Sequence, residues 1–248
     1  MNRKWVVLMG TLILVLAADI PAAAIVNGEP DNGEHPYVAQ LVFYNSGEEW
    51  LWACSGALLS DRLILTAAHC LENDLATNPE GWGPDSVRVY MDEIVAYDPV
   101  SRTWPKTGYY TGSLIPHPKF DWSLPFPETY DIGLIVLDQP VEGLTEFAQL
   151  PELNLLDQIA NGDKRETIMT EVGYGKNETK PDEIWLHSRF MAQAFLISLD
   201  TKLVDDWGIL LSNNPGQWAE SEEIVTGGVC SGDSGGPTLL GGPESNLV

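Results

Sequence analysis

The segment Gly232-Asp233-Ser234-Gly235-Gly236-Pro237 is among the most informative parts of this 248-residue chain. Its glycines give the backbone the freedom to hold a serine hydroxyl outward on a strained turn. The N–H groups of Gly232 and Ser234 can converge and form an oxyanion hole. A glycine-rich turn that merely contains a serine would explain the glycines, but it would not explain two further segments upstream.

Those two segments supply the partners that a serine nucleophile needs. Thr66-Ala67-Ala68-His69-Cys70 carries an imidazole among small neighbours, and Asp131-Ile132-Gly133-Leu134 carries a carboxylate at the head of an apolar strand. We predict that His69 acts as general base and then as general acid, that Asp131 orients its ring, and that Ser234 is the nucleophile. The chain order His, Asp, Ser is one of three in which this chemistry occurs. The nearby alternatives to Asp131 are Asp121, Glu128 and Asp138.

Short apolar runs bounded by Gly, Pro, Asn or Asp make up most of the chain and predict β-strands. Many short strands without alternating helices favour an all-β fold of antiparallel barrels or sandwiches. A short helix is predicted over Leu199 to Leu211, and Val141 to Asp163 is the candidate linker between two halves. The predicted strands are Val38–Tyr44, Ser55–Leu59, Arg62–Thr66, Ser86–Met91, Ile132–Leu137, Thr167–Val172, Ser188–Leu199 and Pro237–Leu240.

The chain resembles the chymotrypsin/trypsin-like serine protease family. The resemblance implies two six-stranded antiparallel β-barrels with the active site between them, and hydrolysis of polypeptide substrates through an acyl-enzyme. It runs from Ile25-Val26-Asn27-Gly28 through Ser55–Leu59, the segments around His69 and Asp131, and Gly173-Tyr174-Gly175, to the segment around Ser234.

Residues 1–24 are expected to be a secretory signal peptide. Arg3 and Lys4 precede an apolar run, and Ala22-Ala23-Ala24 supplies small residues for cleavage. The expected organisation is therefore a signal peptide over 1–24, a first barrel over 25–145, and a linker with the second barrel over 146–248. We expect the protein to be secreted.

The resemblance also assigns a role to the residue that follows the signal peptide. In this family a free amine at the position of Ile25 pairs with the aspartate before the nucleophile, here Asp233, and this pair shapes the oxyanion hole. Relatives usually free that amine by cleavage after Arg or Lys, whereas Ala24 precedes Ile25 here. We therefore expect signal-peptide removal itself to generate the active N-terminus.

The family's spacing places the floor of the specificity pocket at Gly228, with Val229 beside it. Trypsin-like enzymes have an aspartate at that floor to bind Lys or Arg. Its absence here argues against basic specificity and favours an apolar or small side chain before the scissile bond.

Three cysteines leave one without an internal partner. Cys54 and Cys70 are plausible partners, and Cys230 resembles a family cysteine whose partner lies beyond the nucleophile. Relatives carry several tens of residues there, whereas 14 follow Ser234 here. We therefore expect the second barrel to lack its last strands and C-terminal helix. The alternatives to an active protease are a truncated, non-catalytic homologue that acts by protein binding, and an esterase with the same triad.

The formal net charge of −23 predicts a strongly anionic surface. Such a surface repels nucleic acid and anionic membranes and attracts cationic polypeptides at low salt. The expected partners are polypeptide substrates and protein inhibitors, without nucleic acid or membrane, and a monomer is expected. No cofactor or metal is predicted. Asn177-Glu178-Thr179 is a glycosylation sequon.

Overall fold

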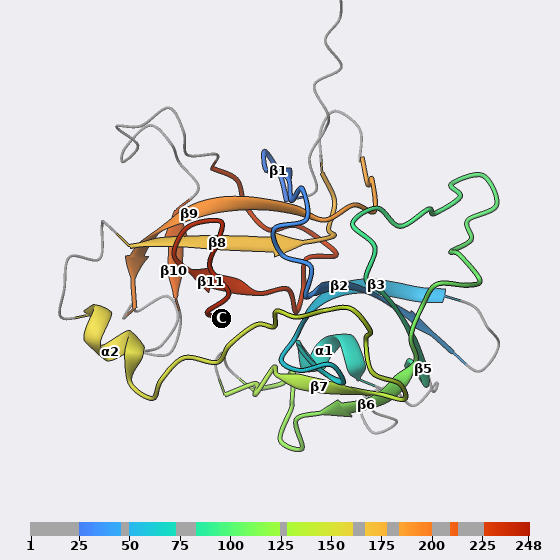
Figure 1. Cartoon of the computed structure of the whole chain (residues 1–248). Helices are drawn as coiled ribbons and strands as arrows, with labels where there is room; N and C mark the ends of the chain where they lie inside the picture. Colours follow the sequence, from blue (N-terminus) through green and yellow to red (C-terminus); the bar gives the residue numbers. More distant parts are fainter. Residues whose placement is uncertain are drawn as a thin grey trace, which may run out of the picture.

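The computed structural model describes residues 25–45, 50–72, 83–124, 128–160, 167–177, 184–199, 209–212 and 226–248. Within these ranges the chain forms two antiparallel β-sheets that face each other (Figure 1). The expected all-β architecture is therefore confirmed. The predicted signal peptide over 1–24 lies outside the described residues.

The first sheet has six strands in the order β5-β2-β3-β4-β7-β6. A pair of hydrogen bonds between Val89 and Tyr110, each 2.9 Å long, joins β5 to the segment before β6 and brings the two edges of the sheet together. The strands are β2 (Val38–Tyr44), β3 (Trp50–Leu58), β4 (Leu63–Thr66), β5 (Ser86–Tyr90), β6 (Gly112–Pro116) and β7 (Gly133–Leu137).

The second sheet has the order β1-β9-β8-β11, with β10 also paired to β9. Five strands thus form this sheet among the described residues, where the family pattern has six. The N-terminal strand β1 belongs to this sheet although it precedes the whole first sheet in sequence. The strands are β1 (Glu29–Pro30), β8 (Ile168–Gly173), β9 (Phe190–Ser198), β10 (Leu210–Ser212) and β11 (Thr238–Leu240).

Two short helices accompany the sheets, α1 (Ala68–Leu71) and α2 (Leu155–Ala160). The α2 helix lies in the segment expected to be a linker. The helix predicted over 199–211 is wrong at its end, because Leu210 and Leu211 pair with β9 as β10. The middle of that predicted helix, residues 200–208, lies outside the described residues.

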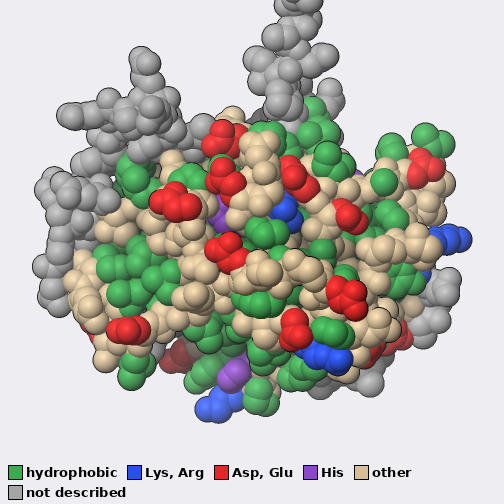
Figure 2. Space-filling model, viewed as in Figure 1, with side chains coloured by type: hydrophobic (Ala, Val, Ile, Leu, Met, Phe, Trp, Pro, Cys, Tyr) green, Lys and Arg blue, Asp and Glu red, His purple; other side chains and the backbone are tan. Residues whose placement is uncertain are grey.

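The two sheets share one hydrophobic core. All seven residues of β2 are buried, which fits its position near the centre of the first sheet. Val172, Met191 and Leu239 bring side chains from the second sheet into the same core. At the surface, Figure 2 shows more Asp and Glu than Lys and Arg side chains on the face in view, as the net charge requires.

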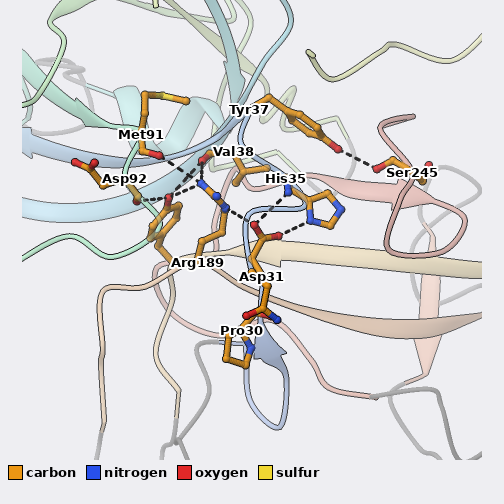
Figure 3. Close-up of polar contacts among 11 residues, drawn as sticks. Pro30, Asp31, His35, Tyr37, Val38, Met91, Asp92, Arg189 and Ser245 are labelled. Atoms are coloured by element: carbon orange, nitrogen blue, oxygen red, sulfur yellow. Dashed lines mark hydrogen bonds and ion pairs between the residues drawn. The ribbon is translucent and has the colours of Figure 1, made fainter. Parts of the chain in front are cut away.

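A buried network of hydrogen bonds and an ion pair also connects the two sheets (Figure 3). Arg189, just before β9, donates from Nε to Asp31 Oδ2 at 2.7 Å and from Nη1 to the carbonyl of Val38 in β2 at 3.1 Å. His35 Nδ1 lies 2.5 Å from Asp31 Oδ1. Burial alone would raise the pKa of Asp31, but the hydrogen bonds from His35 and Arg189 outweigh it and lower that pKa below its ordinary value.

Candidate active site

His69 and Asp131 lie side by side because β4 pairs with β7. Thr66, at the end of β4, is opposite Gly133, at the start of β7. This pairing sets the helix that carries His69 beside the segment that carries Asp131. A Cβ at Gly133 would lie 2.5 Å from Leu71 Cδ1, so the glycine of this motif lets α1 approach the strand.

Two hydrogen bonds join the pair. His69 Nδ1 lies 2.7 Å from Asp131 Oδ2, and the His69 backbone N–H donates to Asp131 Oδ1 at 2.8 Å. Burial favours the neutral acid, but these bonds outweigh it and lower the pKa of Asp131 below its ordinary value. Asp131 is therefore ionised at neutral pH and fixes the ring, which leaves Nε2 as the ring nitrogen available for proton transfer.

The turn that carries Ser234 packs against the segment before His69. Gly235 has φ +77°, and a Cβ there would clash with the Thr66 hydroxyl and the Ala67 amide, so only glycine fits. The Ser55 N–H in β3 donates to the Ser234 carbonyl at 2.9 Å. His69 and Ser234 both line one cavity of ≈ 530 Å³, so residues from the two halves of the chain meet at one site.

The predicted oxyanion donors lie on the same turn. Gly232 has φ +102°, and it lines the same cavity as Ser234. Within the part of the chain that the structure describes, neither the Gly232 nor the Ser234 N–H donates a hydrogen bond. Their role as oxyanion donors stays a prediction.

The predicted disulfide is confirmed. Cys54 in β3 and Cys70 in α1 are joined, with their Cα atoms 6.4 Å apart. The bond ties the helix that carries His69 to the central strands of the first sheet. Cys230 is a free cysteine and is partly buried.

Comparison with known proteins identifies the family. The Trypsin family model matches residues 25–245. The chain belongs to the trypsin family. It is 31% identical to "Snake venom serine protease PTLE1" of Gloydius halys over 98% of this chain and 83% of that protein, and 27% identical to "Chymotrypsin" of Phaedon cochleariae over 92% and 73%. The solved structure of HL collagenase has a similar fold, with a TM-score of 0.58 and 24% identity over 90% of this chain and 84% of that one.

In this trypsin-family chain the carboxylate of Asp233 is buried next to Ser234, the predicted nucleophile. It accepts hydrogen bonds from the N–H of Gly175 at 2.7 Å and of Cys230 at 2.8 Å. A Cβ at Gly173 or Gly175 would clash with this carboxylate, which explains the Gly-Tyr-Gly motif. Burial raises the pKa of Asp233 to about 6 in spite of the two amide donors. Because residues precede Ile25 here, its nitrogen is an amide, and the Ile25–Asp233 pair stays a prediction.

The two residues predicted at the pocket floor lie away from the cavity that His69 and Ser234 line, and their role stays a prediction. Gly228 pairs through its backbone with Val26, and Val229 is 61% exposed. Both line a second cavity of ≈ 230 Å³ together with Glu171, which the sequence analysis missed. Glu171 is 7% exposed, and burial together with the nearby charge of Asp233 raises its pKa to about 7. The signal for it was a carboxylate within the apolar run of β8.

Membership of a protease family implies polypeptide substrates. Among the described residues, none of the helices has the length and apolar character needed to cross a bilayer.

Proposed function

We propose that this chain is a secreted serine endopeptidase in which Ser234 is the nucleophile, His69 the general base and acid, and Asp131 the orienting carboxylate. The main support for the proposal is that His69, Ser234 and Gly232 line a single cavity. On the His69 ring, Nδ1 is hydrogen-bonded to the ionised Asp131. A protein that acted only by binding would not need this arrangement, so we favour a catalytic function.

Acylation begins when Ser234 Oγ attacks the carbonyl carbon of the scissile bond and its proton moves to His69 Nε2. The carbonyl oxygen becomes an oxyanion, which the N–H groups of Gly232 and Ser234 stabilise. Collapse of this intermediate breaks the C–N bond, and His69 gives its proton to the leaving nitrogen. The acyl group is left as an ester on Ser234.

Deacylation repeats these steps with water. His69 takes a proton from the water as the water oxygen bonds to the acyl carbon, and Ser234 Oγ departs with that proton. The negative charge of Asp131 stabilises the imidazolium that forms in both halves of the reaction. Every proton is returned by the end of the cycle.

Signal-peptide removal after Ala24 is the proposed activation step. The freed amine of Ile25 would pair with Asp233, whose buried carboxylate accepts hydrogen bonds from two amides and, within the described residues, from no cationic side chain. Secreted protein should begin at Ile25 when its N-terminus is sequenced. A different first residue would rule out this route.

A fluorophosphonate probe tests the catalytic assignment directly. We expect intact mass spectrometry of the purified secreted chain to show one covalent adduct. The Ser234→Ala variant, which removes only the hydroxyl, should show none. A folded wild-type protein that stays unlabelled would contradict the proposal and favour a binding homologue.

A further inference from the structure

The cavity at His69 and Ser234 has tryptophan walls that the catalytic steps do not use. It extends from these two residues between the beginning of β3 and the segment before β9. Trp50 and Trp52 come from β3, and Trp185 comes from the opposite side. With a volume of ≈ 530 Å³, the cavity has room for a large side chain beside the reacting atoms.

The walls are held in place by contacts inside the protein. Trp52 donates its indole N–H to the Cys70 carbonyl at 3.0 Å, and Trp185 donates to the Tyr174 carbonyl at 2.6 Å. The ring of Trp50 packs edge-on against Trp104 at 6.0 Å. Because two of the indole N–H groups are already satisfied and the rings are braced, the cavity offers apolar faces that need little ordering when a ligand binds.

The position of the cavity decides which part of a substrate it receives. The predicted pocket residues Gly228 and Val229 line the second cavity, and no described residue lines both cavities. The residue before the scissile bond is expected there. The residue after the bond carries the nitrogen that His69 must protonate, so it lies against the cavity that His69 lines.

We infer that the tryptophan-walled cavity of Trp50, Trp52 and Trp185 binds an aromatic or large aliphatic side chain of the residue that follows the scissile bond. The inference rests on the proposed function.

Acyl transfer to added amines measures the preference for the residue after the scissile bond separately from the preference for the residue before it. When an amine attacks the ester on Ser234, its nitrogen bonds to the acyl carbon, its proton passes to His69, and Ser234 Oγ leaves with that proton. This is the reverse of acylation, so the amine occupies the site of the leaving residue. We would compare peptide thiobenzyl esters that end in alanine, leucine, phenylalanine or lysine. The ester that is hydrolysed fastest would serve as the acyl donor. Amides of phenylalanine, leucine, alanine and lysine then compete with water.

Phenylalanine and leucine amides should capture the acyl group about tenfold or more better than alanine amide. Lysine amide should capture it less well than phenylalanine amide, because its ammonium group would leave water against apolar walls. The Trp50→Ala variant should reduce the phenylalanine-to-alanine ratio to near one. The matched control is Trp122→Ala: Trp122 contacts the His69 ring at 5.4 Å between centroids but does not line the cavity, so the ratio should stay at its wild-type value. The Trp185→Leu variant keeps an apolar wall without the aromatic face and should lower the phenylalanine-to-leucine ratio, which tests the site even where Trp50→Ala does not fold.

Equal capture of all four amides by wild-type enzyme that hydrolyses an ester would overturn the inference and leave the proposed function standing. Loss of the preference in Trp122→Ala and not in Trp50→Ala would also overturn it. Hydrolysis of none of the esters by folded protein would count against the proposed function, and the inference would fall with it.

Discussion

Asp131 is held to His69 by two hydrogen bonds, so replacing it with asparagine should damage catalysis far more than folding. The Asp131→Asn amide cannot stabilise imidazolium and favours the wrong ring tautomer. We expect kcat for ester hydrolysis to fall by about 10⁴-fold, the loss known for this change in a related triad. Asp121→Asn is the matched control, because Asp121 is one of the alternative carboxylates and its side chain only caps a turn at Ser123. A large loss in Asp121→Asn with an active Asp131→Asn would reverse the assignment.

Glu171 makes stability depend on pH. Its pKa rises from 4.5 to about 7 on folding. Between these two pH values, Glu171 is therefore mostly protonated in the folded state and mostly ionised in the unfolded state. Stability is therefore greatest below pH 4.5 as far as this group is concerned, and it declines as pH rises towards 7. The full shift corresponds to a penalty of about 3 kcal/mol.

Glu171→Gln should remove this penalty. Its urea midpoint at pH 8 should exceed that of the wild type, whereas the two should be similar at pH 4. The exposed Glu152→Gln serves as control and should change neither value. If Glu171→Gln were no more stable than the wild type at pH 8, other interactions of the folded protein would have to offset the cost of burying the ionised carboxylate.

The residues of the candidate site differed in how well the sequence could predict them. His69, Asp131 and Ser234 stand in motifs whose glycines and alanines are required by close packing, as Gly133 and Gly235 show. Glu171 was missed because a carboxylate in an apolar strand looks the same whether it faces solvent or a cavity. Spacing located Gly228 along the chain, but it could not show which cavity that residue lines.

At the scale of elements, continuous apolar runs were predictable and edge strands were not. The fully buried β2 has the predicted bounds, Val38–Tyr44. The β6 strand was missed because its side chains alternate between exposed and half-buried and because Gly112 and Pro116 bound it. The start of β3 at Trp50 was also missed, since its first residues are stabilised by pairing with Phe43 and Tyr44 rather than by their own pattern.

The disulfide between β3 and α1 should contribute measurably to stability. It closes a loop with a sequence separation of 16 residues, for which restriction of the unfolded chain predicts about 3 kcal/mol. The Cys54→Ala/Cys70→Ala double variant should show a correspondingly lower free energy of unfolding in urea. Cys230→Ala removes the free thiol and should stay close to wild type. A larger effect of Cys230→Ala than of the double variant would contradict this account.

For the whole molecule, the proposed catalysis requires the two sheets to stay together. His69, in α1, and Asp131, just before β7, lie beside the first sheet, and the turn with Ser234 leads into β11 of the second. Besides the shared core, a hydrogen bond from Tyr37 to the Ser245 carbonyl at 2.9 Å ties residues after β11 to the start of the first sheet. We therefore expect the geometry of the site to depend on contacts far from it, among them the buried network around Arg189.

Arg189→Met tests that dependence. Asp31 and Arg189 are 0% and 2% exposed, so the variant leaves the buried carboxylate with only its hydrogen bonds from His35 and should cost about 3 kcal/mol of stability. The Asp31 contribution is present above its ordinary pKa of 3.8 and is lost as pH falls through its lower folded value, so the difference from wild type should shrink in acid. Urea unfolding followed by tryptophan fluorescence measures both effects. Arg62→Met is the control, because the Arg62 guanidinium is exposed and donates to a surface carbonyl.

Because Arg189 reaches the Val38 carbonyl across the sheets, the fluorophosphonate labelling rate of Arg189→Met should also fall under conditions where the variant is still folded. An unchanged labelling rate together with reduced stability would mean that the network stabilises the fold without setting the geometry of the site.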